Sequence, residues 1–597
     1  MTERERFTLN RRRFLMGSAA AAASAVLAAC GGSSGTTPTA TTGAAGATKP
    51  AGAATSGSTP AASASTPAAQ TTGGAAPTFG AVSTVGVQVK TSIQNPAPGK
   101  PQGNKPSELV LVWGTNQLTT HAIDPQTHVG TIAESMLRHM YEPLVKVERD
   151  GKTVSPLLAL EWKRLDDNTM QFKLRQNVKF HNGEDFNAES VKYSIMRPLD
   201  PKNNAAARST YSVIDRVDVV DPYTVNVHTE KPDPALLSRM TGFSMVQMAP
   251  KWTEQNAEPG GVLKSGNGTG PYKFKSWSPN QDLVVESNEA YWGGAPQIKN
   301  VRMKIISEQA TRVAALRSGE IHVAKDMPPE EVDGINKGGR QTARAVASNR
   351  VPYYVMDTRK PPTDNPKLRQ AINYAVDWDS IIQGVLLGNG TRIATVLPPW
   401  TTGFDPKLAP YPYDPDKAKS LVKEAGFTTG VDLNVWYQQG RYMKDKEVAE
   451  AFVQQLSKVG IRAKGNLTDS TVLTTKDNAK ELDGLVFASW GNWIFDADNM
   501  LYARFSIETR DTTNNAKGVS SINYGNTQFN DLITQARYTI DSEKRNALYA
   551  QAQKTMFDDS PALFMYNLTD IYGVDNWVKW EPRFDEMVWA YEMKWNE

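Results

Sequence analysis

One stretch of the chain reads Gln171-Phe172-Lys173-Leu174-Arg175-Gln176-Asn177-Val178-Lys179-Phe180-His181-Asn182-Gly183. Apolar residues alternate with polar ones over residues 171–174 and again over residues 178–180, a pattern that predicts two short strands. The polar residues between them and the His-Asn-Gly that follows are typical of turns. The stretch therefore predicts strands beside turns.

Strand and helix patterns alternate along the rest of the chain. The apolar run Val110–Trp113 predicts a buried strand, and Ile132–Tyr141 predicts a helix. Pro366–Val376 and Asp416–Ala425 carry apolar residues at helical spacing. The fold class is therefore predicted to be mixed α/β. No repeat of roughly 20 to 50 residues is evident in the sequence, which argues against a solenoid or a propeller.

Length and charge restrict the class of protein. The roughly 490 residues from Glu108 onward are too many for one core and predict two or three structural units. The formal net charge is +3, with 66 Lys and Arg against 63 Asp and Glu. Binding to nucleic acid demands a basic excess, so nucleic acid is not an expected partner.

The amino terminus contains an export pattern. Cys30 is the only cysteine of the 597 residues and directly follows Leu27-Ala28-Ala29, which resembles a lipobox. The pair Arg11-Arg12, with Phe14-Leu15 two residues later, resembles a twin-arginine signal. We expect residues 1–29 to be a twin-arginine/lipoprotein signal peptide and Cys30 to carry lipid. A membrane-spanning anchor is the weaker alternative, because residues 14–29 fall short of the ~20 needed to cross a bilayer.

Residues 30–107 consist mainly of Ala, Thr, Ser, Gly and Pro. Such a composition cannot bury a core, so a disordered tether is predicted. A flexible coil of ~75 residues has a reach of ~50 Å, which would hold a folded body away from the lipid. A spacer for glycosylation or for passage through a cell wall stays an open alternative.

Several short blocks then occur in a fixed order along the chain. They are Tyr141–Val145, Pro156–Ala159, Phe172–Arg175, Val178–Gly183, Gly268–Tyr272, Tyr291–Gly294, Leu316–Glu320, Leu368–Ala375 and Tyr413–Pro415. Together they resemble the dipeptide- and oligopeptide-binding family (family 5) of extracytoplasmic solute-binding proteins of ABC transporters. Two positions depart from the family pattern, because Ser190 and His322 each stand where an Asp is usual.

The resemblance implies a two-lobe periplasmic-binding-protein fold, type II-like, with an extra subdomain in the first lobe. It implies lobe I at residues 108–350 with the inserted subdomain at about 141–264, lobe II at 351–567, and a return to lobe I at 568–597. Closure of the lobes over a solute would then be recognised by the transporter.

Other kinds of site find little support in the sequence. The Gly-rich run at residues 266–270 precedes a strand pattern and lacks the Gly-Lys-Ser/Thr of a phosphate-binding loop. The six histidines lack metal-site spacing, and no Gly-x-Ser-x-Gly motif is present in the sequence from Glu108 onward. We therefore expect no catalytic residue, no metal and no cofactor. A pair of distant carboxylates, as in a glycosidase, stays an open alternative.

The segment from Ser489 to Asn499 is the strongest candidate for ligand contact. In the resembling family, an Asp three residues after a Trp pairs with a peptide's amino group. Trp493 stands at that position here, which puts amine recognition in doubt unless Asp496 or Asp498 replaces it. The candidate ligand residues are Gly130, Thr131, Ile132, Ala133, Ser489, Trp490, Gly491, Asn492, Trp493, Asp496 and Asp498. Alternatively, both Trp side chains pack in the core and residues 130–133 simply begin a helix.

The expected function is a receptor that is held at the outer face of the cytoplasmic membrane by its lipid and delivers a peptide or peptide-like solute to ABC permease subunits. We expect a monomer. An oligosaccharide receptor, favoured by Trp493, and a ligand sensor without transport are the alternatives, and an enzyme comes third.

Overall fold

The computed structural model describes residues 92–93, 95–115, 123–128, 130–151, 153–203, 205–206, 208–242, 244–259, 263–507, 522 and 524–597. The signal peptide, Cys30 and the tether as far as residue 91 lie outside the described residues. Within the part that is described, no helix has the length and apolar character needed to cross a membrane.

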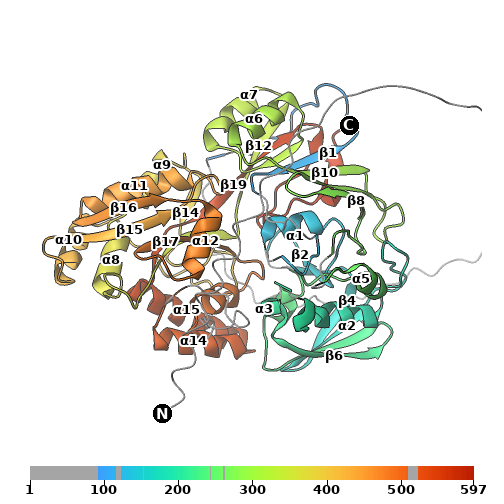
Figure 1. The fold of residues 1–597 in the computed structure, drawn as a ribbon, viewed down its shortest axis with the longest axis horizontal. Coiled ribbons are helices and arrows are strands. Elements are labelled where there is room, and N and C mark those ends of the chain that lie inside the picture. Colours follow the sequence, from blue (N-terminus) through green and yellow to red (C-terminus); the bar gives the residue numbers. More distant parts are fainter. Residues whose placement is uncertain are drawn as a thin grey trace, which may run out of the picture. The chain divides into compact units, whose positions relative to one another are not determined.

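The first lobe is built around an eight-stranded sheet (Figure 1). Its strands, in spatial order, are β12 (Gln341–Ala347), β19 (Tyr566–Asp575), β11 (Val323–Lys325), β1 (Leu109–Trp113), β10 (Asn300–Ile305), β9 (Asp282–Ser287) and β8 (Tyr272–Ser278), and β14 (Gly390–Arg392) also pairs with β19. The prediction of a buried strand at residues 110–113 is confirmed by β1, where Leu109, Leu111 and Trp113 are fully buried. β1 runs parallel to β10 and to β11.

The first lobe also contains short helices and strands outside this sheet. They are α1 (Thr131–Leu137), α5 (Pro250–Asn256), α6 (Gln309–Ser318), α7 (Val332–Lys337), β2 (Val145–Val147), β3 (Val154–Pro156), β20 (Val578–Lys579) and β21 (Lys594–Trp595). The predicted helix at residues 132–141 is found as α1 but ends at Leu137. At this end of the helix, Nδ1 of His139 lies 3.1 Å from the carbonyl oxygens of Ser135 and Met136 and satisfies backbone groups of the last turn.

A second, four-stranded sheet also belongs to this part of the chain. Its order is β4 (Ala159–Asp166), β5 (Thr169–Leu174), β7 (Thr224–Thr229) and β6 (Ile214–Asp221), and it carries α2 (Ala188–Met196), α3 (Arg208–Tyr211) and α4 (Leu236–Arg239). The predicted strand at residues 171–174 is confirmed by β5. The predicted strand at residues 178–180 is wrong, because Lys179 forms only an isolated bridge to Asp185 beside a left-handed Asn177.

Both departures from the family pattern have a local structural role. Ser190 completes a capping box with Asn187 at the start of α2, where each side chain accepts a hydrogen bond from the other's backbone N–H. His322 accepts a hydrogen bond at Nδ1 from the N–H of Val110 (2.9 Å). Ser190 and His322 therefore each accept a hydrogen bond from a backbone N–H, at the start of α2 and on β1 respectively.

The second lobe is built around a five-stranded sheet (Figure 1). Its order is β16 (Ile461–Leu467), β15 (Val431–Tyr437), β17 (Leu485–Gly491), β13 (Arg350–Met356) and β18 (Ala562–Phe564). Its helices are α8 (Pro366–Tyr374), α9 (Trp378–Gly384), α10 (Pro415–Glu424), α11 (Asp445–Ser457), α12 (Ser470–Asn478), α13 (Ala503–Phe505), α14 (Thr527–Tyr538) and α15 (Ser542–Asp559). The predicted helices at residues 366–376 and 416–425 are confirmed by α8 and α10.

The chain passes directly from a strand of one sheet to a strand of the other at two places. It leaves β12 at Ala347 for β13 at Arg350, and it leaves β18 at Phe564 for β19 at Tyr566. The side-chain amide of Asn567 joins the two crossings, because it donates to the carbonyl oxygens of Ser348 (2.8 Å) and Arg350 (3.0 Å). The two connections therefore lie side by side.

The described residues just before β1 pack on the first lobe, although their composition predicts a disordered tether. Asn95 bonds both backbone groups of Ala345 on β12, donating to its carbonyl oxygen (2.8 Å) and accepting from its N–H (2.6 Å). Ile93 is buried in the core beneath this sheet. The side chain of Asn95 can hold this segment in place because β12 is an edge strand, whose outer backbone groups are not paired with another strand.

Candidate functional site

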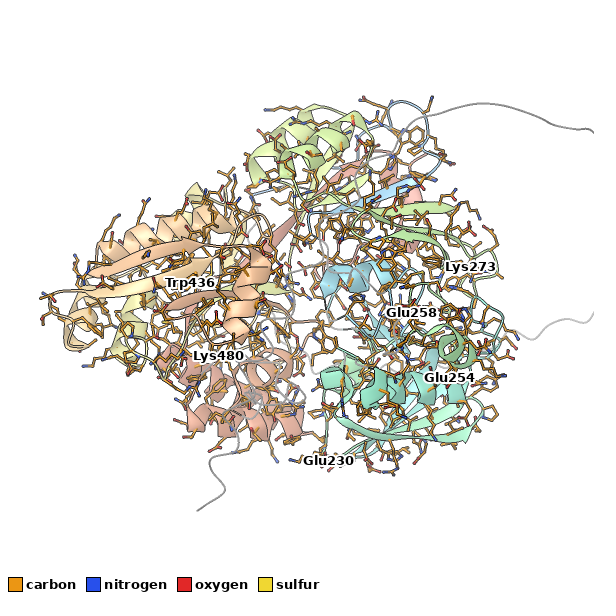
Figure 2. The ribbon with its side chains drawn as sticks, viewed as in Figure 1. Glu230, Glu254, Glu258, Lys273, Trp436 and Lys480 are labelled. Carbon is orange, nitrogen blue, oxygen red and sulfur yellow. The ribbon has the colours of Figure 1, made fainter. Side chains whose placement is uncertain are left out.

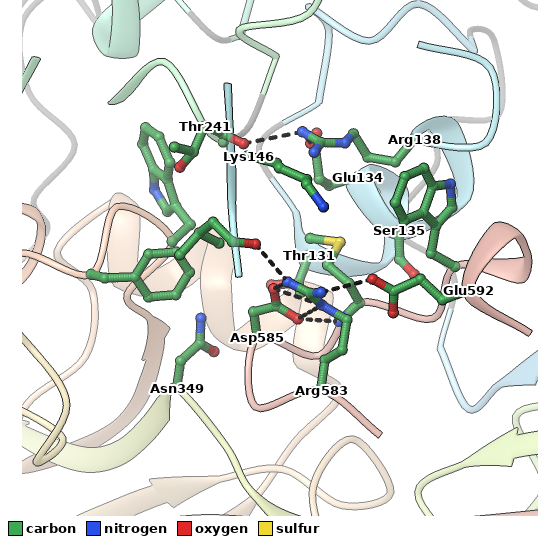
Figure 3. Close-up of a pocket in the computed structure, with 16 residues that line it drawn as sticks. Thr131, Glu134, Ser135, Arg138, Lys146, Thr241, Asn349, Arg583, Asp585 and Glu592 are labelled. Carbon is green, nitrogen blue, oxygen red and sulfur yellow. Dashed lines mark hydrogen bonds and ion pairs between the residues drawn. The ribbon is translucent and has the colours of Figure 1, made fainter. Parts of the chain in front are cut away.

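A cavity lies between the two lobes (Figure 3). It holds about 680 Å³ of space free of atoms, part of it open to solvent. Its walls come from α1, from the strand β2, from the loop after α4, from Asn349 at the first crossing, from the segment after β17 and from residues 583–592 of the returning chain. A cavity at a lobe interface is the usual setting for a small solute.

Aromatic and apolar side chains form much of the wall. They are Val147, Trp493, Phe495, Met587 and Trp589. Small and polar residues complete it, namely Thr131, Ser135, Thr241, Gly242 and Asn349. The combination suits a solute that has both apolar and hydrogen-bonding parts.

The charged lining is balanced, with three acidic and three basic side chains. They are Glu134, Asp585 and Glu592 against Arg138, Lys146 and Arg583. Arg583 lies 2.7 Å from Asp585 and 2.9 Å from Glu592, and Arg138 lies 3.1 Å from Glu134 (Figure 3). The cavity therefore presents charges of both signs at a formal net charge of zero.

Burial disfavours the charged form of both Glu134 and Arg583, but only for Arg583 do the ion pairs outweigh it. Burial is the largest influence on Glu134 and raises the pKa of its carboxyl group, which Arg138 offsets in part. For Arg583, burial opposes the charge, but the ion pairs with Asp585 and Glu592 outweigh it and hold the pKa above its usual value. Arg583 therefore stays positively charged. A cationic group on a solute would stabilise the ionised form of Glu134, which burial disfavours.

Hydrogen bonds connect the cavity wall to the first connection between the sheets, where β13 begins at Arg350. Arg350 donates from Nη2 to Oγ1 of Thr131 (2.8 Å) and to the carboxylate of Glu586 (2.8 Å). Glu586 also pairs with Lys325 (3.2 Å), and all of these side chains are buried. Because Arg350 opens β13 and Thr131 opens α1, this network joins the cavity to the chain segment about which the lobes would turn.

The structure brings two of the predicted ligand residues, Thr131 and Trp493, to the cavity wall. Of the other first-lobe candidates, Gly130 caps α1, Ala133 is buried in the core, and Ile132 packs against that core. These three residues lie at the start of α1 and are not among the residues that line the cavity. Their contact with the ligand stays a prediction.

The other second-lobe candidates make contacts within the protein. Trp490 donates from Nε1 to Oδ1 of Asn499 (2.9 Å) and lies under the guanidinium of Arg504, which is 4.8 Å from its ring. Asn492 donates to the carbonyl oxygen of Asp496 (3.0 Å). Ser489 and Gly491 lie on β17 opposite Pro352 and Arg350 of β13.

The two acidic candidates are buried in ion pairs. Arg545 donates to both carboxylate oxygens of Asp496, at 2.6 and 2.7 Å. Asp498 pairs with Arg239 and, at 3.3 Å, with Arg537. Neither carboxylate is among the residues that line the cavity.

The sequence did not identify the charged lining residues or the aromatic pair Phe495 and Trp589. Phe495 lies inside the candidate segment and has a left-handed backbone (φ 56°), which local sequence does not reveal. Charged and aromatic residues are mixed over residues 583–592, and that mixture is the signal that could have identified the returning chain as part of the site. Among the described residues, no group of three or more His, Cys, Asp or Glu is placed to hold a metal ion.

Comparison with known proteins identifies the family. Residues 153–510, more than half of the chain, match the bacterial extracellular solute-binding proteins, family 5 (middle region). The chain belongs to this family. The glutathione-binding protein GsiB of Escherichia coli K12 is 28% identical to this family 5 chain over 465 residues, which cover 76% of the chain and 88% of GsiB.

Solved structures confirm the predicted two-lobe α/β fold of this family 5 protein. The ABC transporter-associated protein DppA of Helicobacter pylori, in complex with the peptide STSA, matches with a TM-score of 0.72 at 24% identity, covering 82% of this chain and 98% of DppA. The dipeptide-binding protein of Pseudoalteromonas sp. SM9913, in complex with Met-Leu, matches with a TM-score of 0.73 at 22% identity, covering 82% and 100%. The family consists of extracellular solute-binding proteins, which agrees with the expectation of a protein without catalysis.

Proposed function

We propose that this family 5 protein is a lipid-anchored receptor that captures a peptide or peptide-like solute between its lobes and delivers it to an ABC importer. The charge-balanced cavity carries the proposal. A short peptide is a zwitterion with apolar side chains, and the wall offers carboxylates, cations and aromatic faces within one cavity. The lobe boundaries at residues 350 and 567, and the subdomain at about 141–264, are part of the same proposal.

The solute's amino group has three candidate partners in the cavity. Trp493 cannot supply a charge, and Asp496 and Asp498 do not line the cavity. The carboxylates on the wall are Glu134, Asp585 and Glu592, each of which already pairs with an arginine. The oligosaccharide alternative is less well supported. A sugar has no formal charge to match six charged lining residues, and the relatives named above bind glutathione or peptides.

The first test uses solute-induced stabilisation and closure. Met-Leu or glutathione, at ~100 times its dissociation constant, should raise the free energy of unfolding by ~2.7 kcal/mol. Small-angle scattering should show compaction of the same sample. Maltotriose is the matched control and should do neither. Stabilisation by maltotriose but by neither peptide would support the oligosaccharide alternative, and stabilisation without a change in shape would contradict closure.

The second test concerns the anchor. In a bacterium that processes lipoproteins, Cys30→Ala should release the protein from the membrane fraction, because it removes the site at which acyl chains attach. Mass spectrometry of the parent's amino terminus should find an acylated Cys30 as the first residue. Unchanged membrane fractionation of the variant would contradict the lipoprotein proposal and would leave the solute-binding proposal intact.

A further inference from the structure

We infer that Arg239 and Asp498 form a clamp between the lobes that positions the Trp493 wall, so that solute affinity depends on two residues outside the cavity lining. This inference extends the proposed capture of a solute between the lobes and rests on it for its binding measurements. Its starting observation is the buried ion pair between these two side chains, which are 259 positions apart in the chain.

The two partners belong to different cores. Arg239 ends α4, whose Leu236 packs in the core of the four-stranded sheet of the first lobe. Asp498 begins a five-residue π-helical turn (Asp498–Tyr502), whose Leu501 packs with Val351 in the core of the second lobe. The side chains of Arg239 and Asp498 are 7% and 3% exposed. The pair therefore crosses the lobe interface and excludes water.

Charges alternate on both sides of this pair. Asp233 lies 2.8 Å from Arg239 within the first lobe, and Arg537 lies 3.3 Å from Asp498 within the second. Separation of the lobes would leave Asp233 with Arg239 and Asp498 with Arg537, so neither half would hold an unpaired charge. Since an unpaired buried charge is the main cost of breaking such a pair, the arrangement suits a contact that forms and breaks repeatedly.

Electrostatics keeps the acidic partner ionised. Burial is the largest influence on Asp498 and raises the pKa of its carboxyl group, but the Arg537 and Arg239 guanidinium groups outweigh it, and the pKa lies below its usual value. The attraction across the interface is therefore present at neutral pH.

The same two chain segments form part of the cavity wall. Gly242 follows Arg239 by three residues, and Trp493 precedes Asp498 by five. A Cβ atom on Gly242 would lie 2.7 Å from Cε3 of Trp493 and 3.2 Å from its carbonyl oxygen. Gly242 and Trp493 both line the cavity, so glycine permits a backbone approach that seats the indole against the first lobe. The ion pair holds the segments that make this contact.

Further contacts between the lobes provide a comparison. Lys231, next to Glu230 at the end of β7, has its ammonium 4.9 Å from the ring of Tyr538 (Figure 2 labels Glu230). Lys444 of the second lobe pairs with Glu330 of the first lobe, but these side chains are 23% and 45% exposed. An exposed pair contributes little, which makes Lys444→Gln the matched control for any ion pair between lobes.

The test is a double-mutant cycle on Arg239→Gln and Asp498→Asn. Calorimetry with Met-Leu and glutathione should show each single variant weakened by roughly tenfold to a hundredfold, and the double variant no weaker than either. The loss of affinity should appear mainly as faster dissociation of the solute, because the ion pair between the lobes forms after the solute has entered the cavity. Lys444→Gln should bind like the parent. Additive losses in the double variant, or parental affinity in both single variants, would overturn the clamp.

A ligand-free measurement separates this inference from the proposed function. In a Cys30→Ala background the chain has no cysteine, so Glu254→Cys on α5 and Lys423→Cys on α10 provide two exposed labelling sites, one on each lobe. We expect a larger label separation in Asp498→Asn than in the parent. If the parent binds neither peptide, the proposed solute class fails while this comparison still decides the clamp. Equal separations in parent and variant would overturn it.

Discussion

Asp496→Asn should lower the free energy of unfolding by about 3 to 5 kcal/mol, because it leaves the guanidinium of Arg545 buried without its counter-charge. The pair is bidentate, at 2.6 and 2.7 Å, and its side chains are 3% and 5% exposed. Arg545 also lies 4.9 Å from the ring of Tyr549, so its position is fixed by packing as well as by charge. Chemical denaturation at pH 7 measures the loss.

The second lobe offers a matched control for this prediction. Arg462 contacts both carboxylate oxygens of Asp432, at 2.7 and 3.1 Å, but in full solvent. Asp432→Asn should therefore leave stability nearly unchanged. A third variant, Asp496→Leu with Arg545→Met, removes both charges together and should lose less than Asp496→Asn alone. An Asp496→Asn protein that keeps parental stability but no longer binds peptide would restore Asp496 as a ligand residue.

Much of the fold follows from local pattern. The helices α8 and α10 and the strand β1 lie where apolar spacing predicts them, because each buries one continuous apolar set. The prediction at residues 178–180 fails because the alternation there belongs to a loop. The N–H of Phe180 donates to the carbonyl oxygen of Glu184 (2.8 Å), so turn hydrogen bonds replace a neighbouring strand.

The site is less predictable because its geometry depends on distant partners. Asp496 and Asp498 have the chemistry to bind an amine, but Arg545 and Arg239, which engage them, are 49 and 259 positions away. The segment at residues 583–592 is expected to return to the first lobe, and its mixture of charged and aromatic residues is a signal for a site. The spacing of these residues does not indicate that Arg583 and Trp589 are among those that face the cavity. Sequence spacing reveals which residues share a helix or strand, and it does not reveal which charges are already paired.

Acid should destabilise the protein through His139, which is fully buried beside the cavity helix α1. Its Nε2 accepts a hydrogen bond from the N–H of Ala590 (3.0 Å), which leaves Nδ1 as the donor toward the carbonyl oxygens of Ser135 and Met136. A second proton on Nε2 would face another N–H. Burial is the largest influence on this group and lowers the pKa of His139 to about 4.

The sign of the effect follows from linkage. The pKa of His139 is lower in the folded protein than the ~6.5 of an unfolded chain, so its contribution is complete above pH ~6.5 and is lost as the pH falls toward 4. The loss amounts to about 3 kcal/mol at most. Buried Glu134 and Glu142 act in the opposite sense, because burial raises the pKa of each carboxyl group. Comparison with His139→Gln therefore isolates the histidine. Denaturation at pH 7 and pH 4.5 should show a smaller fall for the variant than for the parent. Parallel falls would mean that the acid sensitivity arises elsewhere.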